Sequence, residues 1–522
     1  MSGKEDLRHG AKVARGATYI FIQGFISAAM GVVYIVFLTR LISQEEIGMF
    51  GVLTFILGLV QILGLLALPS ASIKYIAQFI AKGNFKKAKA VVTRVMQISI
   101  VIAIAAFALV FALSNWISSL LSCSPFVIQT LAFASVFVVL YFQALGFLQG
   151  LQMMGKVAAV NLIYSFVQYG LALLLVYSGL GLLGITISWL IALVIAFSLA
   201  LILTAKNLGI IGTPYGLRPL LSFSFPLYIS SVLGFVILWV DQLFVLPYKG
   251  LETFGAYNIA NRAAVVPGLI SSALLAALFP KLAQLYTEIG KDSLENAFTV
   301  TTRYVVLVGF PMITGVAILA YPIIILFAGV QYAAAALPLT ILCVASLFVT
   351  LGVAINPTFF TMERTGIASV VIFVSILADA IFSFVFIVSL DMGIIGAAIA
   401  KVIAAFCGFL LGIVILKNFI KVKFDVEMLW KVLFACFIMM LALLGFDVIR
   451  QLSSGSPYQF LVFRLHLLPI YVLIGTVAYF LAIIALGAIK KEDVELFREY
   501  LPYKLTWAAT LLERFVRNKK TS

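Results

Sequence analysis

Histidine is almost absent from this chain, which has 2 histidines in 522 residues, and Asp, Glu, Lys and Arg together make up only 11% of it. Two histidines cannot supply a multi-histidine metal site, so we expect no metal and no other cofactor. The chain also lacks a Gly-rich phosphate loop followed by Lys and Ser or Thr, and it lacks the Ser/His or paired-Asp sets of membrane hydrolases and glycosyltransferases. The sequence therefore predicts a protein that is not an enzyme and does not itself hydrolyse ATP.

Cysteine is scarce as well, with 4 in the whole chain. Cys343, Cys407 and Cys436 fall within long apolar runs, and only Cys123 falls in a predicted outer loop. A single outer cysteine has no nearby partner on that side, so we expect no extracellular disulfide.

Apolar residues are abundant and make up 64% of the chain. Crossing about 30 Å of hydrocarbon takes about 20 apolar residues in a helix, because no other backbone satisfies its hydrogen bonds there. Fourteen runs meet this requirement, which predicts an all-α polytopic membrane protein with about 14 transmembrane helices. These runs are residues 18–38, 47–68, 92–113, 126–149, 157–178, 182–204, 221–246, 263–285, 304–327, 335–355, 367–389, 394–416, 428–448 and 463–488.

The distribution of Lys and Arg predicts the topology. With a cytoplasmic N terminus, 29 of the 35 Lys and Arg residues fall on the cytoplasmic side and 5 on the outer side, in agreement with the positive-inside rule. The net charge of +15 is then mostly a topology signal and does not indicate nucleic-acid binding. We expect a multi-pass protein of the cell membrane with both termini in the cytoplasm and without a cleaved signal peptide.

Two halves of the chain repeat each other. Glu45, Gly48 and Phe50 are answered by Glu252, Gly255 and Tyr257 at an offset of 207 positions. The same relation continues along the chain at slightly larger offsets, with Arg94 and Arg303, Gly155 and Gly366, and Gly184 and Gly396. Since each copy holds six runs, both copies enter the membrane from the same side and the repeat is parallel.

The repeat and the charge pattern together predict six regions. They are a cytoplasmic lead at 1–17, an N-terminal six-helix lobe at 18–204, a cytoplasmic linker at 205–220, a C-terminal six-helix lobe at 221–416, two additional transmembrane helices within 428–488, and a basic amphipathic cytoplasmic tail at 489–522.

Two segments carry a family resemblance. They are LTRLISQEEIGMFGVL after the first apolar run, and WVDQLFVLPYKGLETFGAYNIANR followed by LFPKLAQLY. In these pieces, and over most of residues 10–416, the chain resembles the polysaccharide and oligosaccharide flippases of the multidrug/oligosaccharidyl-lipid/polysaccharide exporter superfamily. The resemblance implies a twelve-helix core of two lobes with two added helices. It also implies alternating-access flipping of a polyprenyl-(di)phosphate-linked oligosaccharide to the outer leaflet, for cell-surface polysaccharide or glycan assembly.

Other functions fit the same fold. An ion-coupled multidrug or metabolite antiporter is the main alternative, although the N-terminal lobe has no Asp or Glu inside its apolar runs, where such an antiporter would be expected to have them. A membrane scaffold or an unusual glycosyltransferase is disfavoured by the lack of a catalytic set. The expected partners of a flippase are its lipid-linked sugar, membrane lipids, H+ or Na+ as a coupling ion, and other glycan-assembly proteins.

Cationic residues are the candidates for binding a phosphate-bearing head group, because a bare phosphate in a low-dielectric cleft is very costly. Arginines stand at matching places in the two repeats. Arg15 and Arg218 precede the first helix of each lobe, whereas Arg40 and Arg262 flank the predicted outer mouth. The alternative is that each anchors the chain to lipid head groups or only sets topology; the same alternatives apply to Arg94 and Arg303.

Three further charges lie in or at the end of apolar runs, where each charge costs about 2.5–3.5 kcal/mol at mid-bilayer. Asp379 and Lys401 are either a structural ion pair between neighbouring helices or a site for substrate (Lys401) and coupling ion (Asp379). Asp241 is a candidate for ion coupling or gating.

Overall fold

The computed structural model describes residues 2–289, 291–362, 364–422, 424–453 and 467–489. Within these ranges the side chains of residues 2–15, 17, 269–293, 296, 297 and 365 are not described. The predicted cytoplasmic tail at 489–522 lies almost entirely outside the described residues.

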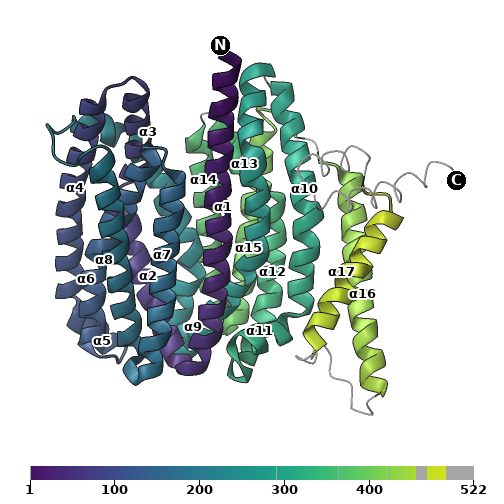
Figure 1. Cartoon of the computed structure of the whole chain (residues 1–522). Coiled ribbons are helices and arrows are strands. Elements are labelled where there is room, and N and C mark those ends of the chain that lie inside the picture. Colours follow the sequence, from purple (N-terminus) through teal and green to yellow (C-terminus); the bar gives the residue numbers. More distant parts are fainter. Residues whose placement is uncertain (1, 290, 363, 423, 454–466, 490–522) are drawn as a thin grey trace. The chain divides into compact units, whose positions relative to one another are not determined.

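The described residues form helices joined by short turns and loops and include no strand (Figure 1), which confirms the all-α fold. Twelve stretches among them are long and apolar enough to cross a membrane. One of these, Met154–Asn207, contains two of the predicted segments, and every one of the fourteen predicted segments coincides at least in part with a helix.

The chain divides into two compact units. Unit 1 comprises residues 1–258 and 327–331, and unit 2 comprises residues 259–326 and 332–522. Unit 1 thus extends past the predicted end of the N-terminal lobe and includes the first part of the second repeat. The predicted lobe boundaries remain predictions.

The helices of unit 1 are α1 Ser2–Leu41, α2 Gln44–Leu65, α3 Leu68–Ala81, α4 Phe85–Ala112, α5 Ser114–Leu120, α6 Pro125–Gly150, α7 Met154–Leu175, the π-helical turn η1 Val176–Leu180, α8 Gly181–Asn207 and the first part of α9 Leu217–Ile289. Their boundaries follow local chemistry. Ser43 and Glu46 form a capping box at the start of α2, and Gly83, at φ 67°, ends the α3 segment one residue before Asn84 caps α4.

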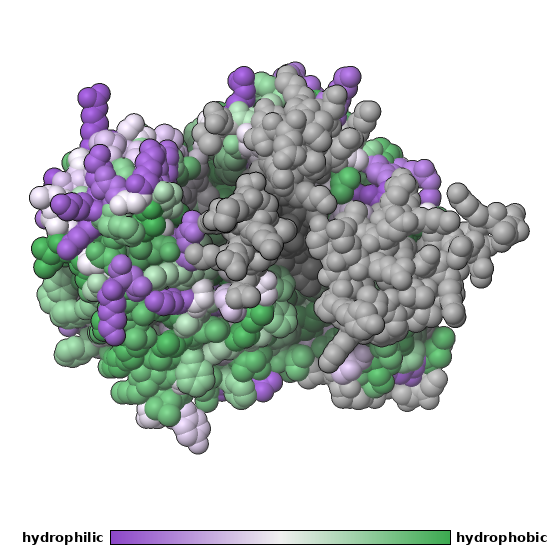
Figure 2. All heavy atoms as spheres, turned by 45° about the horizontal axis from the view of Figure 1, so that its top comes forward, coloured by the Kyte–Doolittle hydropathy of each residue, from purple (hydrophilic) through white to green (hydrophobic). Residues whose placement is uncertain are grey.

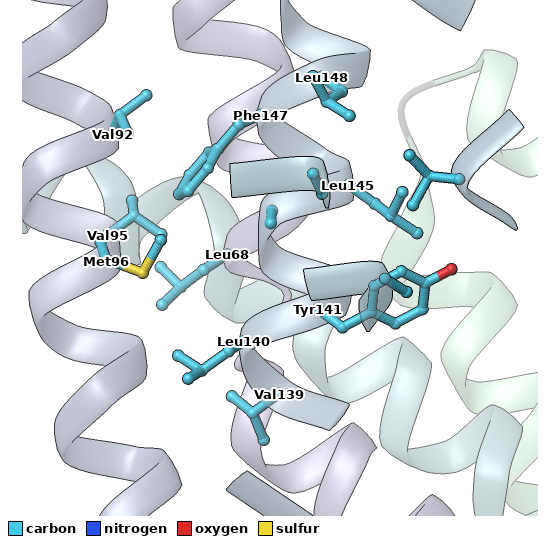
Figure 3. Close-up of a cluster of buried hydrophobic side chains, with 14 of the residues drawn as sticks. Leu68, Val92, Val95, Met96, Val139, Leu140, Tyr141, Leu145, Phe147 and Leu148 are labelled. Atoms are coloured by element: carbon cyan, nitrogen blue, oxygen red, sulfur yellow. The ribbon is translucent and has the colours of Figure 1, made fainter. Parts of the chain in front are cut away.

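The core of unit 1 lies where α3, α4, α6 and α8 meet. Figure 3 shows part of it, with Leu68 from α3, Val95 and Met96 from α4, and Leu140 and Phe147 from α6. Since lipid is as apolar as these side chains, their close packing rather than the hydrophobic effect holds the helices together.

The helices and helical turns of unit 2 are the remainder of α9, α10 Lys291–Ile318, α11 Ala320–Ala328, η2 Val330–Ala335, α12 Ala336–Leu351, α13 Ile355–Thr361, α14 Thr365–Ser383, the π-helical turn η3 Phe384–Ser389, α15 Gly393–Leu416, α16 Val426–Ser453 and α17 Leu468–Ala485. One core cluster joins α10 to the α16–α17 pair, and the hydroxyl of Tyr479 donates to the carbonyl of Leu307 at 2.7 Å.

The structure repeats as the sequence does. A π-helical turn precedes the sixth membrane helix of each repeat, η1 before α8 and η3 before α15. Just after each turn lies one of the paired glycines. A Cβ on Gly184 would lie 2.8 Å from Leu175 Cβ, and one on Gly396 would lie 2.8 Å from Phe386 Cβ. Both glycines therefore allow the fifth and sixth helices of a repeat to approach closely, which supports the parallel duplication.

Polar and apolar surfaces are separated in unit 1. In Figure 2, hydrophilic side chains gather over the end formed by α3 and α4, and apolar side chains cover the flank below. Lys74, Lys82 and Lys86 of α3 and α4 are exposed, while Phe25 of α1 and Phe166 of α7 expose 71% and 70% of their surfaces. This is the pattern of a membrane-spanning bundle with a basic end.

Candidate functional site

The charges predicted in the eleventh and twelfth membrane helices meet in unit 2. Lys401 Nζ on α15 lies 3.3 Å from Asp379 Oδ2 on α14. The Asp379 side chain is fully buried and Lys401 is 19% exposed, while Ser383 donates a longer hydrogen bond of 3.4 Å to Asp379 Oδ1. The two charges thus form the ion pair that the sequence left open as one of two interpretations, and the partly exposed lysine is the member that a ligand could reach.

Asp241 lies in the first half of α9 in unit 1 and is fully buried. The hydroxyl of Tyr257 donates to Asp241 Oδ2 at 2.5 Å, and Asn258 Nδ2 donates to Gln242 Oε1 at 2.9 Å. Residues sixteen apart in a straight helix would be about 24 Å apart, so α9 must reverse between them. It does so at Gly250, whose φ of 79° and ψ of 174° lie outside the helical region and suit glycine.

The four candidate arginines are distributed over both units. Arg40 is exposed in the last turn of α1, and Arg218 is exposed in the first turn of α9, both in unit 1. Arg262 is half-buried in α9 within unit 2. Arg15 belongs to α1, but its side chain lies outside the described residues. A shared role for these arginines remains a prediction.

Arg94 is held by the chain that leaves the first repeat. Its Nε donates to the carbonyl of Tyr215 at 2.9 Å, and the Tyr215 amide donates to the carbonyl of Ala90 at 3.0 Å. Thr93 adds a hydrogen bond of 2.6 Å to the carbonyl of Ile210. These contacts fasten the linker between α8 and α9 onto α4.

Arg303, the repeat equivalent of Arg94, does the same in unit 2. Its Nη1 donates to Asp425 Oδ2 at 3.0 Å, just before α16, and its Nη2 donates to the carbonyl of Ala488 at 3.1 Å, just after α17. One guanidinium on α10 therefore holds both ends of the α16–α17 pair. In each repeat, the arginine at the base of the third membrane helix fastens the segment that follows the sixth.

Polar side chains also join the first helix to the rest of unit 1. Gln23 Nε2 donates to Ser27 at 3.2 Å, and Ser27 shares a hydrogen bond of 2.9 Å with Ser165 of α7. Asn161 of α7 bridges Gln23, at 3.4 Å, and the hydroxyl of Tyr141 of α6, at 2.5 Å. Within the membrane these hydrogen bonds fix the position of α1 against α6 and α7.

Comparison with known families decides the classification. Residues 13–286, more than half of the chain, match the family described as polysaccharide biosynthesis protein. The chain belongs to this polysaccharide biosynthesis protein family. The expected membership of a polysaccharide biosynthesis family is thereby confirmed.

One curated relative matches most of this family member and a second matches a shorter part. The chain is 23% identical over 442 residues to the "Probable low-salt glycan biosynthesis flippase Agl15" of Haloferax volcanii, covering 85% of this chain and 91% of that protein. It is 30% identical over 112 residues to the "Succinoglycan biosynthesis transport protein ExoT" of Rhizobium meliloti, covering 21% of this chain and 22% of that protein.

Solved structures share its fold. The inward closed conformation of the lipid II flippase MurJ matches with a TM-score of 0.71 and 18% identity, over 89% of this chain and 97% of MurJ. An inward-facing multidrug resistance MATE family transporter of the MOP superfamily matches with a TM-score of 0.65 and 16% identity, over 75% of this chain and 95% of the transporter. This family member is therefore a multi-pass membrane protein with the fold common to these transporters.

One buried charge cluster in this family member, centred on Asp447, was not predicted from the sequence. In the α16–α17 pair, Asp447 is 1% exposed and accepts hydrogen bonds from Arg450 at 2.6 Å, from the hydroxyl of Tyr471 at 2.6 Å and from Gln451 at 2.6 Å. The available signal was an Asp and an Arg three residues apart at the end of an apolar run. With its charge matched and its oxygens bonded, the cluster ties α16 to α17.

Proposed function

We propose that this chain is a flippase that moves a polyprenyl-(di)phosphate-linked oligosaccharide from the cytoplasmic to the outer leaflet by alternating access, in the assembly of cell-surface polysaccharide or glycan. The observation that carries the proposal is membership of the polysaccharide biosynthesis protein family together with similarity to a named glycan flippase over 85% of the chain. A duplicated bundle with short loops suits this task, since transporters built from two parallel repeats alternate access by rocking one repeat against the other.

The charges of the chain receive roles within this proposal. Arg15, Arg40, Arg218 and Arg262 bind the phosphate of the head group along its path, and Lys401 adds a cation that Asp379 holds in place. Asp241 and Asp379 take part in gating or in coupling to H+ or Na+. The protein lies in the cell membrane with both termini in the cytoplasm, acts without a cofactor, is not an enzyme, and works beside other glycan-assembly proteins.

The alternative function is an ion-coupled multidrug or metabolite antiporter. The similarity to a MATE transporter supports a shared fold, and a shared fold does not specify the substrate. The two functions require different ligands. A flippase binds an amphiphilic anion, whereas a drug antiporter of this class binds cations or neutral organic molecules.

Ligand-dependent thermal stabilisation of the purified protein separates these functions, because a ligand of the folded state raises the melting temperature. We expect stabilisation by a polyprenyl diphosphate sugar, a smaller effect from the polyprenyl phosphate alone, and none from the cationic dye ethidium. Arg262→Gln should weaken the stabilisation by the first ligand. Stabilisation by ethidium but not by either polyprenyl compound would favour the antiporter.

A further inference from the structure

Two repeat-equivalent segments of unit 1 pack directly against each other. They are the start of α2, residues 44–51, and residues 251–258 of α9, which correspond at the offset of 207. A Cβ added to Gly48 would lie 2.1 Å from the carbonyl oxygen of Leu251, and one added to Gly255 would lie 2.7 Å from the carbonyl oxygen of Gln44. Gln44 and Leu251 correspond in the repeat, and so do Gly48 and Gly255.

The contact is therefore self-complementary, as in a twofold interface: each segment presents the same glycine to the same carbonyl of the other. The next turn continues it, since a Cβ on Gly51 would lie 2.7 Å from Phe254 Cε1 and 3.3 Å from Nδ2 of Asn258, which is the equivalent of Gly51. At Gly48 and Gly255 the two backbones meet with no side chain between them.

Buried hydrogen bonds fix one partner in this contact. Tyr257 and Asn258 donate to Asp241 and Gln242, which holds residues 251–258 against the first half of α9 after the reversal at Gly250. All four side chains are at most 5% exposed. The start of α2 therefore packs against a segment, residues 251–258, that buried hydrogen bonds hold against the first half of α9.

A second segment of the later repeat, residues 327–331, is hydrogen-bonded to the end of α1. The hydroxyl of Thr39 donates to the carbonyl of Phe327 at 3.0 Å, and Gln331 Nε2 donates to the carbonyl of Thr39 at 3.4 Å. Residues 327–331 and 251–258 both fall on the outer side in the predicted topology, as do Thr39 and the start of α2. Each contact joins the first repeat to the second at the outer ends of their helices.

We propose that the paired contact of Gly48 and Gly255 is the outer seal of the transport cycle, a step that rests on the proposed flippase function. A sugar head group can leave only where the outer ends of the two repeats separate. A glycine contact suits a seal that must open and close, because small residues let backbones pack closely without burying a charge. Adding one methyl group to either glycine then favours the opened form.

Labelling measures the seal without relying on transport. In a cysteine-free background, Met49→Cys lies beside Gly48 and is 7% exposed as methionine. We expect Gly48→Ala or Gly255→Ala to speed its reaction with a membrane-impermeant maleimide about tenfold, the result of a shift of about 1.4 kcal/mol in the closed-to-open equilibrium. Gly24→Ala and Gly234→Ala are matched controls, since no heavy atom lies within 4 Å of an added Cβ at either position, and they should leave the rate unchanged.

Cross-linking tests the same seal without adding a methyl group and covers the case in which the alanine variants fail to fold. Gln44→Cys with Leu251→Cys, joined by a reducible bis-methanethiosulfonate, should stop flipping of a fluorescent polyprenyl diphosphate sugar in liposomes, and reduction should restore it. Phe107→Cys with Phe133→Cys joins α4 and α6 within one repeat, where the two rings lie 4.9 Å apart between centroids, and should leave flipping intact.

The outcomes separate the two proposals. Full flipping by the protein cross-linked between positions 44 and 251, or equal labelling of Met49→Cys in the Gly48→Ala and Gly24→Ala proteins, overturns the seal while leaving the flippase function standing. If the unmodified protein flips no probe, the flippase function fails, and the labelling rates alone then decide whether the glycine contact opens.

Discussion

At the scale of single residues, the charges buried in the membrane are found in partnership. Asp379 has Lys401, and Asp447 has Arg450, Tyr471 and Gln451. Burying an ion costs several kcal/mol, and only a close counter-charge with further hydrogen bonds offsets that cost. These contacts therefore contribute to the stability of the fold.

Lys401→Met should destabilise the protein by about 3–5 kcal/mol, because the variant leaves the buried Asp379 carboxylate without its lysine. The double variant Asp379→Leu, Lys401→Met removes both charges and should regain most of that stability. Thermal unfolding in detergent measures both effects. Equal stability of the single and double variants would contradict this account. A double variant that is stable but does not flip lipid-linked sugar would assign the pair a role in transport.

Cys123 reports on topology and on its own ionisation. It lies between α5 and α6, half-buried, and burial raises the pKa of its thiol above the ordinary value. The thiolate is the reactive form. An impermeant maleimide added outside intact cells should therefore react with Cys123 slowly at about pH 7, and the rate should increase as the pH rises to about 9. The Cys123→Ser protein provides the background. Labelling that appears only after the membrane is permeabilised would contradict the predicted topology.

The sequence singled out Asp241, Asp379 and Lys401, because a charge in an apolar run is conspicuous, and the structure shows that both aspartates are buried and that Asp379 and Lys401 form an ion pair. Their roles in binding or coupling remain predictions. The sequence did not identify Tyr257 as the partner of Asp241, since that contact depends on the reversal of α9 at Gly250. The Asp447 cluster was missed because two of its four members, Arg450 and Gln451, lie just beyond the apolar run and Tyr471 is on the next helix.

At the scale of elements, Arg94 and Arg303 act alike. Each lies at the base of a third membrane helix and binds the segment that follows the sixth, at Tyr215 in one repeat and at Asp425 in the other. Sequence placed these two arginines in matching positions but could not choose between head-group binding and anchoring, because the answer lies in segments about 120 residues away. The structure favours anchoring of the chain itself.

The α16–α17 pair should loosen when this anchor is removed. Arg303→Ala loses two hydrogen bonds of a charged group, each worth about 1.5–3 kcal/mol, and should expose Cys436, which is 5% exposed on α16 within the cluster facing α10. Arg303→Lys should have an intermediate effect because an ammonium lacks the planar fork. The rate of Cys436 reaction with a membrane-permeant maleimide measures the change. Arg94→Ala, in unit 1, is the matched control, and an equal effect from it would contradict the assignment.

The helices themselves were predictable, because a hydrophobic stretch of membrane-spanning length has few other structures open to it. The details were not. The π-helical turns η1 and η3 and the short helices α5, α11 and α13 depend on how neighbouring helices pack, and the apolar composition of these segments does not distinguish them from straight helix.

At the scale of the whole molecule, the chain combines two copies of one six-helix repeat with the α16–α17 pair. The proposed function adds a path of cationic residues for the substrate head group. When a substrate with two negative charges moves outward across an inside-negative membrane, its free energy falls by about 2.3 kcal/mol per charge per 100 mV. We therefore expect an inside-negative potential imposed with potassium and valinomycin to accelerate flipping of a diphosphate-linked sugar more than that of a monophosphate-linked one. Rates that stay unchanged after the potential is collapsed would show that the potential does not drive transport.

The flippase function is tested most directly by the access of a reductant to the substrate. Purified protein is placed in sealed liposomes that contain a fluorescent polyprenyl diphosphate sugar, and dithionite is added outside. About half of the fluorescence is quenched in protein-free vesicles, where only the outer leaflet is reached. The proposed function predicts quenching of nearly all of it with the protein present, and no accompanying efflux of a cationic dye. Quenching that stays at the protein-free level, together with dye efflux driven by an ion gradient, would contradict it.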